Sequence, residues 1–369
     1  MSSAGGSDAT VHASETKVTL ADVARRAGVS NMTVSRVVND RPGVGEETRN
    51  RVRSAIAQLG YRPNIVARGL KARRSRTIGL LVPDVTNPYF PEIVRGAEDV
   101  AIRHGFTLLL TNVIEDAERE ASALEAFEDR RVDGVIAASP RLTDDRLHPL
   151  LARHAAAVIV NRRSDPDVAG SVRIDHEHGA RMAIRHLAEV GRTRMAVLAG
   201  PTYSHAGRER LLGADRETRE RGLPLPDARI VTCPPDVDGG ARSAYDLLSR
   251  DPEIDALLCF NDLVAAGALQ AAKELGRRVP HDLSIIGYDD IVFARMFTPA
   301  LSSIRAPTYE LGRHAATMLF QRMRGRGRGV DIVLQPELIV RASTVPVPSA
   351  ADRDADPPDA TPLLEGFHP

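Results

Sequence analysis

The chain has 369 residues, of which 43% are hydrophobic and 27% charged, as in ordinary soluble globular proteins. This length suits two or three domains. No run of eighteen apolar residues occurs, so the sequence predicts no membrane-spanning helix and no membrane partner. The two cysteines, Cys233 and Cys259, form no CxxC pair, and we expect a reduced cytoplasmic protein without a disulfide framework.

The formal net charge of zero hides an asymmetry along the chain. Residues 17–76 contain fourteen Lys and Arg against four Asp and Glu, which leaves 35 and 45 for the remainder. A net charge of +10 on the first segment and −10 on the rest favours a polyanionic partner for the first segment alone. A solvated basic surface is the alternative interpretation.

Residues 18–62 predict three short helices in a helix-turn-helix arrangement. Thr19 is a good N-cap, and Asp22 three residues later completes a pattern that resembles a capping box. Gly28 can adopt the positive φ that the turn requires, and Ser30 can cap the next helix. A third helix is expected at about Glu46–Leu59. The residues expected to form the small core are Leu20, Val23, Ala24, Ala27, Val34, Val37, Val38, Val52, Ile56 and Leu59.

The second of these helices leaves short polar side chains exposed at its start, as a helix that enters the DNA major groove requires. Asn can pair with adenine edges and Arg with guanine, while Met can pack on a thymine methyl group. The base-reading residues are predicted to be Asn31, Met32 and Arg36. The residues predicted to contact the DNA backbone are Thr19, Ser30, Thr33 and Ser35. An ordinary helix surface is the alternative for each of them.

Residues 63–76 combine a helix-breaking proline with a short basic segment. Asn64–Lys71 can form two helical turns, which are too short to be stable alone. Leu70 is a large apolar side chain flanked by cations, a combination that suits insertion into a kinked minor groove. The predicted hinge residues are Asn64, Ala67, Leu70 and Lys71. An interdomain linker with an incidental leucine is the alternative.

From Thr77 onward, short apolar runs alternate with amphipathic stretches. Fully apolar strands that alternate with helices predict an α/β fold with parallel sheets covered on both faces, and the length suggests two such units. The expected strands are 78–82, 107–110, 132–137, 157–160, 172–174, 194–199, 256–260 and 283–286. The expected helices lie near 91–104, 116–130, 178–190, 206–222, 239–250, 262–275 and 308–324.

Ligands of parallel sheets bind beyond the carboxyl ends of the strands, so the residues after each run are candidate ligand contacts. Bidentate donors, paired acceptors and an aromatic pair occur there, which suits a polyhydroxylated or heterocyclic small molecule. These residues are Asp84 to Phe90, Asn161, Arg162, Asp175, Arg208, Arg210, Asn261, Asp262, Asp289 and Asp290. Several have bland alternatives: Arg210 and Asp289 could form an ion pair between lobes, and Asn261 and Asp175 could simply cap helices. His176 and His178 have poor metal-ligand spacing, so no metal or cofactor is predicted.

Several motifs, taken together, resemble the lac-repressor (LacI/GalR) family of transcription regulators. They include VTLADVARRAGVSNMTVSRVVND, EETRNRVRSAIAQLGYRPNIVARGLK, TIGLLVPDVTNPYF, VDGVIAASP, HLAEVGRTRMAVLAGP, FNDLVAAGAL, DLSIIGYDD, FTPALSSI and QPELIVRAST, in family order over residues 18–344. The resemblance implies an N-terminal helix-turn-helix head and hinge helix, followed by two Rossmann-like lobes of periplasmic-binding-protein type. It also implies a homodimer that inserts Leu70 into a palindromic DNA operator, and a small-molecule effector between the lobes. The residues that it matches to effector-facing positions are Tyr89, Phe90, Asn161, Arg210, Asn261 and Asp289.

The Ser/Gly/Ala-rich residues 1–17 are expected to be a disordered arm, and the Pro/Asp-rich residues 346–369 a disordered tail. The resemblance implies a DNA-binding domain over 18–62, a hinge over 63–76 and an effector-binding and dimerisation domain over 77–345. Lobe 1 is expected at about 77–175 plus 307–336. Lobe 2 is expected at about 176–306 plus 337–345.

The leading function is a ligand-responsive transcription regulator, most often a repressor in this family, with a sugar or sugar acid favoured as effector. Ligands that release DNA and ligands that promote binding both occur among relatives. A solute-binding protein would fit the body alone, but the basic head argues against it. An enzyme is disfavoured because no GxGxxG follows a strand and no Walker loop or GxSxG elbow occurs.

Overall fold

The computed structural model describes residues 18–61, 75–223, 225–327 and 330–345, in two compact units divided between Arg73 and Arg74. The expected N-terminal arm and C-terminal tail lie outside the described residues. The same holds for most of the expected hinge, including the predictions for Asn64, Ala67, Leu70 and Lys71.

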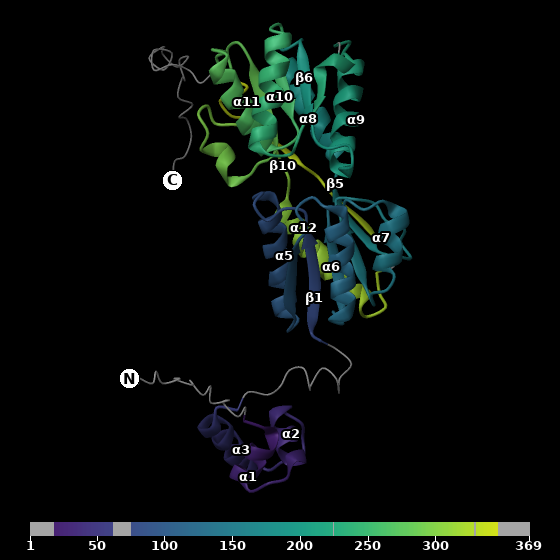
Figure 1. Cartoon of the computed structure of the whole chain (residues 1–369), viewed down its shortest axis with the longest axis vertical. Coiled ribbons are helices and arrows are strands. Elements are labelled where there is room, and N and C mark those ends of the chain that lie inside the picture. The colour runs from purple at the N-terminus through teal and green to yellow at the C-terminus, as the bar shows by residue number, and fades with distance from the viewer. Residues whose placement is uncertain (1–17, 62–74, 224, 328–329, 346–369) are drawn as a thin grey trace, which may run out of the picture. The chain divides into compact units, whose positions relative to one another are not determined.

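The first unit contains α1 (Leu20–Ala27), α2 (Asn31–Val38) and α3 (Glu46–Leu59), which are labelled in Figure 1. Val23, Val34 and Val52 are fully buried at its centre. Leu20, Val38, Ile56 and Leu59 are expected in the core but are only half-buried, because so small a unit cannot enclose every apolar side chain. Ala55 of α3 is buried, so the centre of the helix packs closely on the other two.

The second unit contains two six-stranded sheets, one in each of two lobes. The lobe 1 sheet has the order β11-β5-β4-β3-β1-β2, and the lobe 2 sheet has the order β12-β10-β9-β8-β6-β7. The lobe 1 strands are β1 (Thr77–Val82), β2 (Thr107–Asn112), β3 (Gly134–Ala138), β4 (Ala157–Val160), β5 (Gly170–Ile174) and β11 (Asp331–Leu334). The lobe 2 strands are β6 (Met195–Ala199), β7 (Ile230–Thr232), β8 (Ala256–Cys259), β9 (Ser284–Asp289), β10 (Ser302–Arg305) and β12 (Glu337–Ile339).

Helices cover both faces of each sheet, as fully apolar parallel strands require. In lobe 1, α5 (Tyr89–Arg103) and α12 (Thr308–Arg322) pack on one face, with α6 (Ala117–Asp129) and α7 (Asp144–Leu151) on the other. In lobe 2, α10 (Val237–Arg250) and α11 (Asp262–Glu274) oppose α8 (His176–Glu189) and α9 (His205–Glu220). Short 3-10 turns are η1 (Asp227–Arg229) and η2 (Val292–Arg295). The predicted α/β class is thus confirmed.

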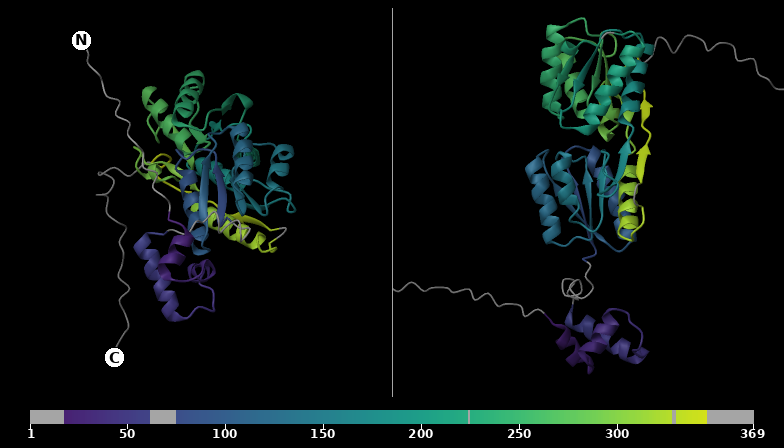
Figure 2. Two further views of the ribbon diagram at one scale, coloured as in Figure 1. Left: turned by 60° about the horizontal axis from the view of Figure 1, so that its bottom comes forward. Right: turned by 90° about the vertical axis from the view of Figure 1, so that its right-hand side faces the viewer.

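The chain crosses between the lobes after β5, after β10 and between β11 and β12. The right-hand view of Figure 2 shows the yellow strands β11 and β12 running from one lobe into the other. β11 is parallel to β5, whereas β12 is antiparallel to β10, which is an exception to the expected parallel pairing. The three crossovers place the carboxyl ends of strands from both lobes at the junction where a ligand of this fold would bind.

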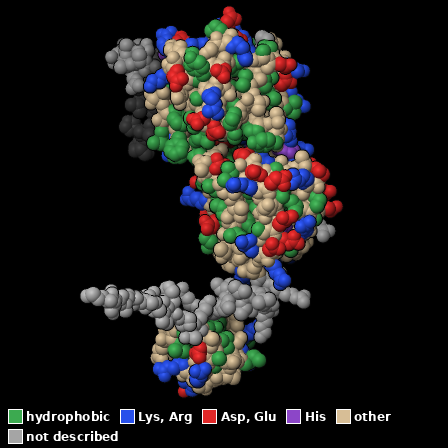
Figure 3. All heavy atoms as spheres, viewed as in Figure 1, with side chains coloured by type: hydrophobic (Ala, Val, Ile, Leu, Met, Phe, Trp, Pro, Cys, Tyr) green, Lys and Arg blue, Asp and Glu red, His purple; other side chains and the backbone are tan. Residues whose placement is uncertain are grey.

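Close helix packing fixes the start of α5, which carries two of the predicted ligand contacts. Gly312 of α12 and Gly96 of α5 face the partner helix, where an added Cβ would lie 2.0 Å from the Ile93 carbonyl oxygen and 2.1 Å from that of Tyr309. Only glycine permits this approach without a shift of the backbone. The outer surface is mixed in charge: Figure 3 shows basic and acidic side chains interspersed over the visible face of each lobe.

Candidate functional sites

The entry to the helix-turn-helix is fixed by a complete capping box. The Asp22 backbone N–H donates to Thr19 Oγ1 at 3.3 Å, while the Thr19 backbone N–H donates to Asp22 Oδ2 at 2.9 Å. The Thr19 hydroxyl also donates to Asp22 Oδ2 at 2.6 Å, and the side-chain and backbone hydrogen bonds that Thr19 donates to this carboxylate hold the pKa of Asp22 below its usual range. Gly28 has φ 65°, and the Ser30 hydroxyl accepts from the Thr33 backbone N–H, so both predicted turn devices are present.

The exposed face of α2 carries the residues predicted to read bases. Asn31, Met32 and Arg36 are exposed, with 65% of Met32 accessible, although burial would stabilise a methionine. The Arg36 side chain has no hydrogen-bond or ion-pair partner among the described residues, and its guanidinium lies near Gly43, where an added Cβ would be 3.3 Å from Nη1. The residues predicted to read bases therefore share one exposed surface, on which side-chain hydrogen-bonding groups can reach DNA.

The side chains predicted to contact the DNA backbone are already engaged locally. Thr33 Oγ1 lies 3.0 Å from Ser30 Oγ, and Ser35 Oγ accepts from Asn39 Nδ2 at 3.4 Å. Their hydroxyl groups can still accept or donate one further bond. Two side-chain contacts link parts of this unit. Arg26 of α1 donates to Gln58 of α3 at 2.9 Å, and Arg49 of α3 pairs with Asp40, which follows α2, at 2.7 Å.

In lobe 2, Arg210 and Asp289 form a buried ion pair at the carboxyl ends of the strands. Arg210 Nη2 lies 3.1 Å from Asp289 Oδ1, and their side chains are only 9% and 5% exposed. Burial raises the pKa of Asp289 to about 6, although Arg210 opposes the rise. An ion pair between these residues was the alternative reading, but both belong to lobe 2, so the pair does not bridge the lobes.

The guanidinium of Arg210 is held from several directions. Its Nη1 donates to the Phe260 carbonyl oxygen, and its Nε lies 3.4 Å from His176 Nδ1. The Tyr288 ring lies 3.6 Å from the guanidinium carbon and the Phe260 ring 5.1 Å from it. Such cation–π contacts are strongest where water is excluded, so Arg210 is oriented before any ligand arrives.

In lobe 1, Asn161 joins Tyr89 to Ser139. The Asn161 amide nitrogen donates to Tyr89 Oη at 2.5 Å and to Ser139 Oγ at 3.0 Å, while its buried Oδ1 has no partner among the described residues. Asn161 and Ser139 have φ values of 60° and 50°. Strained backbone of this kind is concentrated at functional sites, and an orphan buried oxygen calls for a bound partner.

The remaining predicted ligand contacts are placed differently. Phe90 is 5% exposed and meets Tyr89 edge-on at 5.0 Å between ring centroids, so it belongs to the lobe 1 core as much as to the junction. Asn261 caps α11 by accepting from the Val264 N–H at 2.8 Å, and donates to the Pro235 carbonyl oxygen at 3.1 Å. The side-chain oxygen of Asn261 is therefore already used to cap α11. Asp175 likewise caps α8 through the His178 N–H.

Sequence reasoning missed several groups at the same junction. Ser139 follows β3, and the rule of reading residues after strands applies to it as well as to Asn161. Arg141 of lobe 1 lies 5.6 Å from the Tyr203 ring of lobe 2, and pairs with Glu115 at 2.6 Å. Burial, with the charges of Arg162 and Arg208, lowers the pKa of His205 to about 4. No local sequence pattern predicts these contacts between the lobes.

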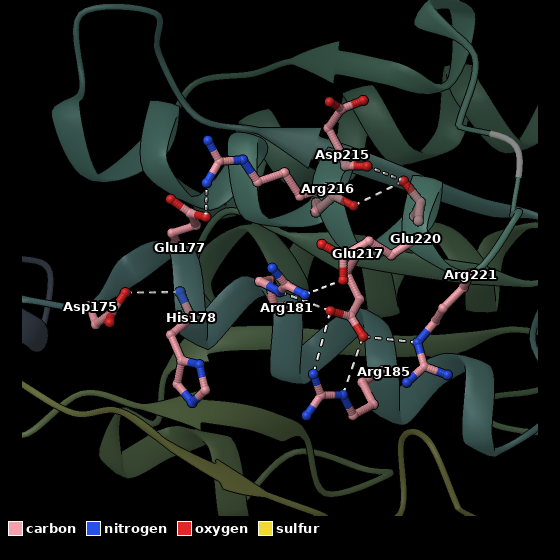
Figure 4. Close-up of polar contacts among 12 residues, drawn as sticks. Asp175, Glu177, His178, Arg181, Arg185, Asp215, Arg216, Glu217, Glu220 and Arg221 are labelled. Carbon is pink, nitrogen blue, oxygen red and sulfur yellow. Dashed lines mark hydrogen bonds and ion pairs between the residues drawn. The ribbon is translucent and has the colours of Figure 1, made fainter.

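A polar hollow of about 670 Å³ lies beside the β5–α8 crossover. Figure 4 shows the adjoining network, in which Glu217 of α9 lies between Arg181, Arg185 and Arg221. Burial opposes ionisation of Glu217, but the hydrogen bonds from these arginines hold its pKa below the usual range. The network ties α8 to α9 and so supports the helix that carries Arg210.

In the part of the chain that the structure describes, no helix is long and apolar enough to cross a membrane. The same residues contain no group of three or more His, Cys, Asp or Glu side chains that could hold a metal ion.

A helix-turn-helix unit joined to two Rossmann-like lobes defines a DNA-binding regulator with a ligand-binding body. Residues 19–64 match the bacterial regulatory proteins of the lacI family, and residues 75–340 match the periplasmic binding proteins and sugar-binding domain of the LacI family. The chain belongs to the LacI family of bacterial transcription regulators, which are not enzymes.

Similar proteins span nearly the whole chain. The HTH-type transcriptional repressor PurR of Shigella sonnei is 37% identical over 337 residues, covering 89% of this chain and 98% of its own. The lac repressor dimer bound to operator and the anti-inducer ONPF is 29% identical, with a TM-score of 0.81 and coverage of 89% and 99%. The complex of the transcriptional regulator CelR with cellobiose is 32% identical, with a TM-score of 0.67 and coverage of 88% and 99%. The protein is thus a ligand-responsive, DNA-binding repressor.

Proposed function

We propose that this repressor binds a palindromic operator as a homodimer in the cytoplasm, and that a sugar or sugar acid at the lobe junction controls its affinity for DNA. The observation that carries the effector class is the combination of Arg210, Asp289 and the unpartnered Asn161 oxygen. Charged donors and acceptors at fixed positions match the hydroxyl groups of a carbohydrate, each of which both donates and accepts. The similarity to the CelR–cellobiose complex supports this class.

The proposed effector contacts are Arg210 and Asp289 in lobe 2, and Tyr89 and Asn161 in lobe 1. Groups from both lobes give a ligand different contacts in the open and closed arrangements, which is what a shift between them requires. Phe90 would supply an apolar wall. Asn261 would contribute a single remaining N–H, because its oxygen caps α11 and its other N–H donates to the Pro235 carbonyl oxygen.

On the DNA side, Asn31, Met32 and Arg36 are proposed to read bases, with Thr19, Ser30, Thr33 and Ser35 on phosphates. The exposure of α2, and a guanidinium of Arg36 that has no partner in the described part of the chain, support direct reading in the major groove. The hinge proposal for Asn64, Ala67, Leu70 and Lys71 depends on the sequence pattern alone.

Exposed apolar side chains support the homodimer. In lobe 2, η2 exposes 51% of Val292 and 46% of Phe293, and Met296 directly after it is 68% exposed. In lobe 1, Leu110 of β2 and Ile114 just beyond it are 39% and 57% exposed. A second copy would cover such patches. Sedimentation of a Phe293→Asp, Ile114→Asp variant tests this: a monomer is expected, and an unchanged mass places the interface elsewhere.

The effector class is tested by thermal melting of the full chain against sugars, sugar acids, sugar phosphates and purines. A ligand at a hundred times its Kd adds about 2.7 kcal/mol of stability. At about 2.1 cal/mol/K per residue over roughly 270 residues, this raises the melting temperature by about 5 °C. The expected hit is a sugar or sugar acid whose effect disappears in Asn161→Ala and persists in Arg219→Ala, a surface change on α9. A purine as the only hit would overturn the proposed class.

A further inference from the structure

His176, the first residue of α8, is a fully buried histidine that neither the sequence motifs nor the DNA-binding mechanism uses. Its Nδ1 lies 3.4 Å from Arg210 Nε and 3.3 Å from Tyr288 Oη. Its Nε2 is buried and has no partner among the described residues. A buried imidazole beside a permanently charged guanidinium needs a physical explanation, since both groups normally seek water.

The contacts fix the protonation of this ring. Arg210 Nε always carries a hydrogen, so it can only donate, and His176 Nδ1 must accept. The single ring proton is then on Nε2. A doubly protonated ring would set two cations and two donors against each other. Burial and the charges of Arg210 and Arg173 accordingly hold the pKa of His176 well below its ordinary value.

The hydrogen bond to Nε determines which way the guanidinium turns. Arg210 has a planar group with donors in a fixed fork, so holding Nε on one side directs Nη2 to Asp289 and Nη1 to the Phe260 carbonyl oxygen. Ring stacking on Tyr288 fixes the plane of the group but not its rotation within that plane. His176 restrains that rotation at Nε, on the edge of the group that Asp289 and the Phe260 carbonyl oxygen do not reach.

We propose that His176 is a positioning residue, which as a neutral Nδ1 acceptor orients Arg210 for the effector. This inference depends on the proposed function for the role of Arg210, but the geometry itself is independent of any ligand. His176 directly follows Asp175, whose backbone N–H donates to the Leu334 carbonyl oxygen of β11 in lobe 1. The residue that orients Arg210 is therefore also the first residue of lobe 2 after the β5–α8 crossover.

Two matched substitutions separate positioning from packing. His176→Asn keeps an acceptor oxygen close to the place of Nδ1, whereas His176→Leu fills similar space without an acceptor. Both remove the imidazole, so both change packing. Only the leucine variant should release the guanidinium of Arg210.

The test is nuclear magnetic resonance of the ligand-free full chain, labelled with ¹⁵N in histidine and arginine side chains. His176→Asn and Arg210→Lys assign the two signals. The His176 ring should show protonated Nε2 and bare Nδ1, unchanged between about pH 5 and pH 8, because the charged groups facing it, Arg210 and Arg173, disfavour a second proton. Exchange of the Arg210 Nε hydrogen with water should quicken about fivefold or more in His176→Leu and stay slow in His176→Asn.

Titration of His176 in that range, a proton on Nδ1, or equal exchange rates in the two variants would overturn the inference. Failure of the proposed function looks different. If the sugar shift in melting temperature persists in Arg210→Lys, Arg210 does not bind the effector, while the ring and exchange signals still report whether His176 orients it.

Discussion

Replacing Arg210 by alanine tests the buried core of the proposed effector site. From the sequence alone, this change is expected to abolish the ligand response with little effect on unliganded stability. The structure alters the second half of that expectation. Arg210 is buried, pairs with buried Asp289, and donates to Phe260 and His176. Alanine removes all these bonds and leaves a carboxylate without its counter-ion.

The size of the loss follows from the charge left behind. Removing one partner of a buried ion pair costs about 3–5 kcal/mol. Burial already raises the pKa of Asp289 to about 6, and loss of Arg210 raises it further, so protonation of Asp289 limits the cost at neutral pH. With an unfolding entropy of about 0.6 kcal/mol/K for roughly 270 residues, the loss corresponds to a fall of about 5–9 °C in melting temperature.

The assay is thermal and urea unfolding at neutral pH of Arg210→Ala, of the double variant Arg210→Ala, Asp289→Asn, and of Arg219→Ala. The last is a matched control, because Arg219 lies on the same helix and its surface pair with Asp215 contributes at most about 1 kcal/mol. The double variant should recover part of the lost stability, because position 289 then carries no buried carboxylate without a counter-ion. A loss below about 1 kcal/mol for Arg210→Ala, or no recovery in the double variant, would refute the reasoning.

Four further outcomes are expected. Because the pKa of Asp289 is raised from 3.8 to about 6, ionisation of this carboxyl weakens the folded state as pH rises through this window, by up to about 3 kcal/mol, and urea titrations between pH 4 and pH 7 should show this part of the pH dependence lost in Asp289→Asn. Gly312→Ala should lose about 1–3 kcal/mol on melting, because its Cβ would meet the Ile93 carbonyl oxygen at 2.0 Å. Arg36→Ala should cost about 1–3 kcal/mol at the operator and little on random DNA, as measured by fluorescence anisotropy. Leu70→Ala should weaken operator binding with an unchanged melting curve; equal affinity would remove the wedge argument.

The strands and helices that sequence reasoning placed are those with a strong local pattern. Apolar runs such as 78–82 and 157–160 lie within β1 and β4, because buried parallel strands need continuous apolar side chains. The strands that it missed lack such runs. β7 and β11 are short, partly exposed edge strands, and β10 reads Ser-Ser-Ile-Arg. Its serines are buried because Ser343, Thr344 and Asp262 bond to them, which no local pattern reveals.

Helix α7 and the proposed effector site likewise depend in part on contacts that no local sequence pattern predicts. α7 contains Pro149 in its interior, which argues against a helix in any local reading, yet Leu147 and Leu151 bury it against lobe 1. Reading the residues after strands found Asn161, Arg210 and Asp289 as candidates. It could not find that Arg210 and Asp289 pair within one lobe, or that His176 reaches Arg210, because these contacts join residues 79 and 34 positions apart, respectively.

In the proposed mechanism, a small molecule bound in the two-lobed body controls how tightly the helix-turn-helix unit holds DNA. The direct measurement is operator affinity of the full chain by fluorescence anisotropy, with and without the carbohydrate that raises its melting temperature, on an operator selected from random DNA. We expect the carbohydrate to change operator affinity about 5–150-fold, which corresponds to a coupling of about 1–3 kcal/mol, and this change to be lost in Arg210→Lys. A carbohydrate that stabilises the chain but leaves operator affinity unchanged would contradict it.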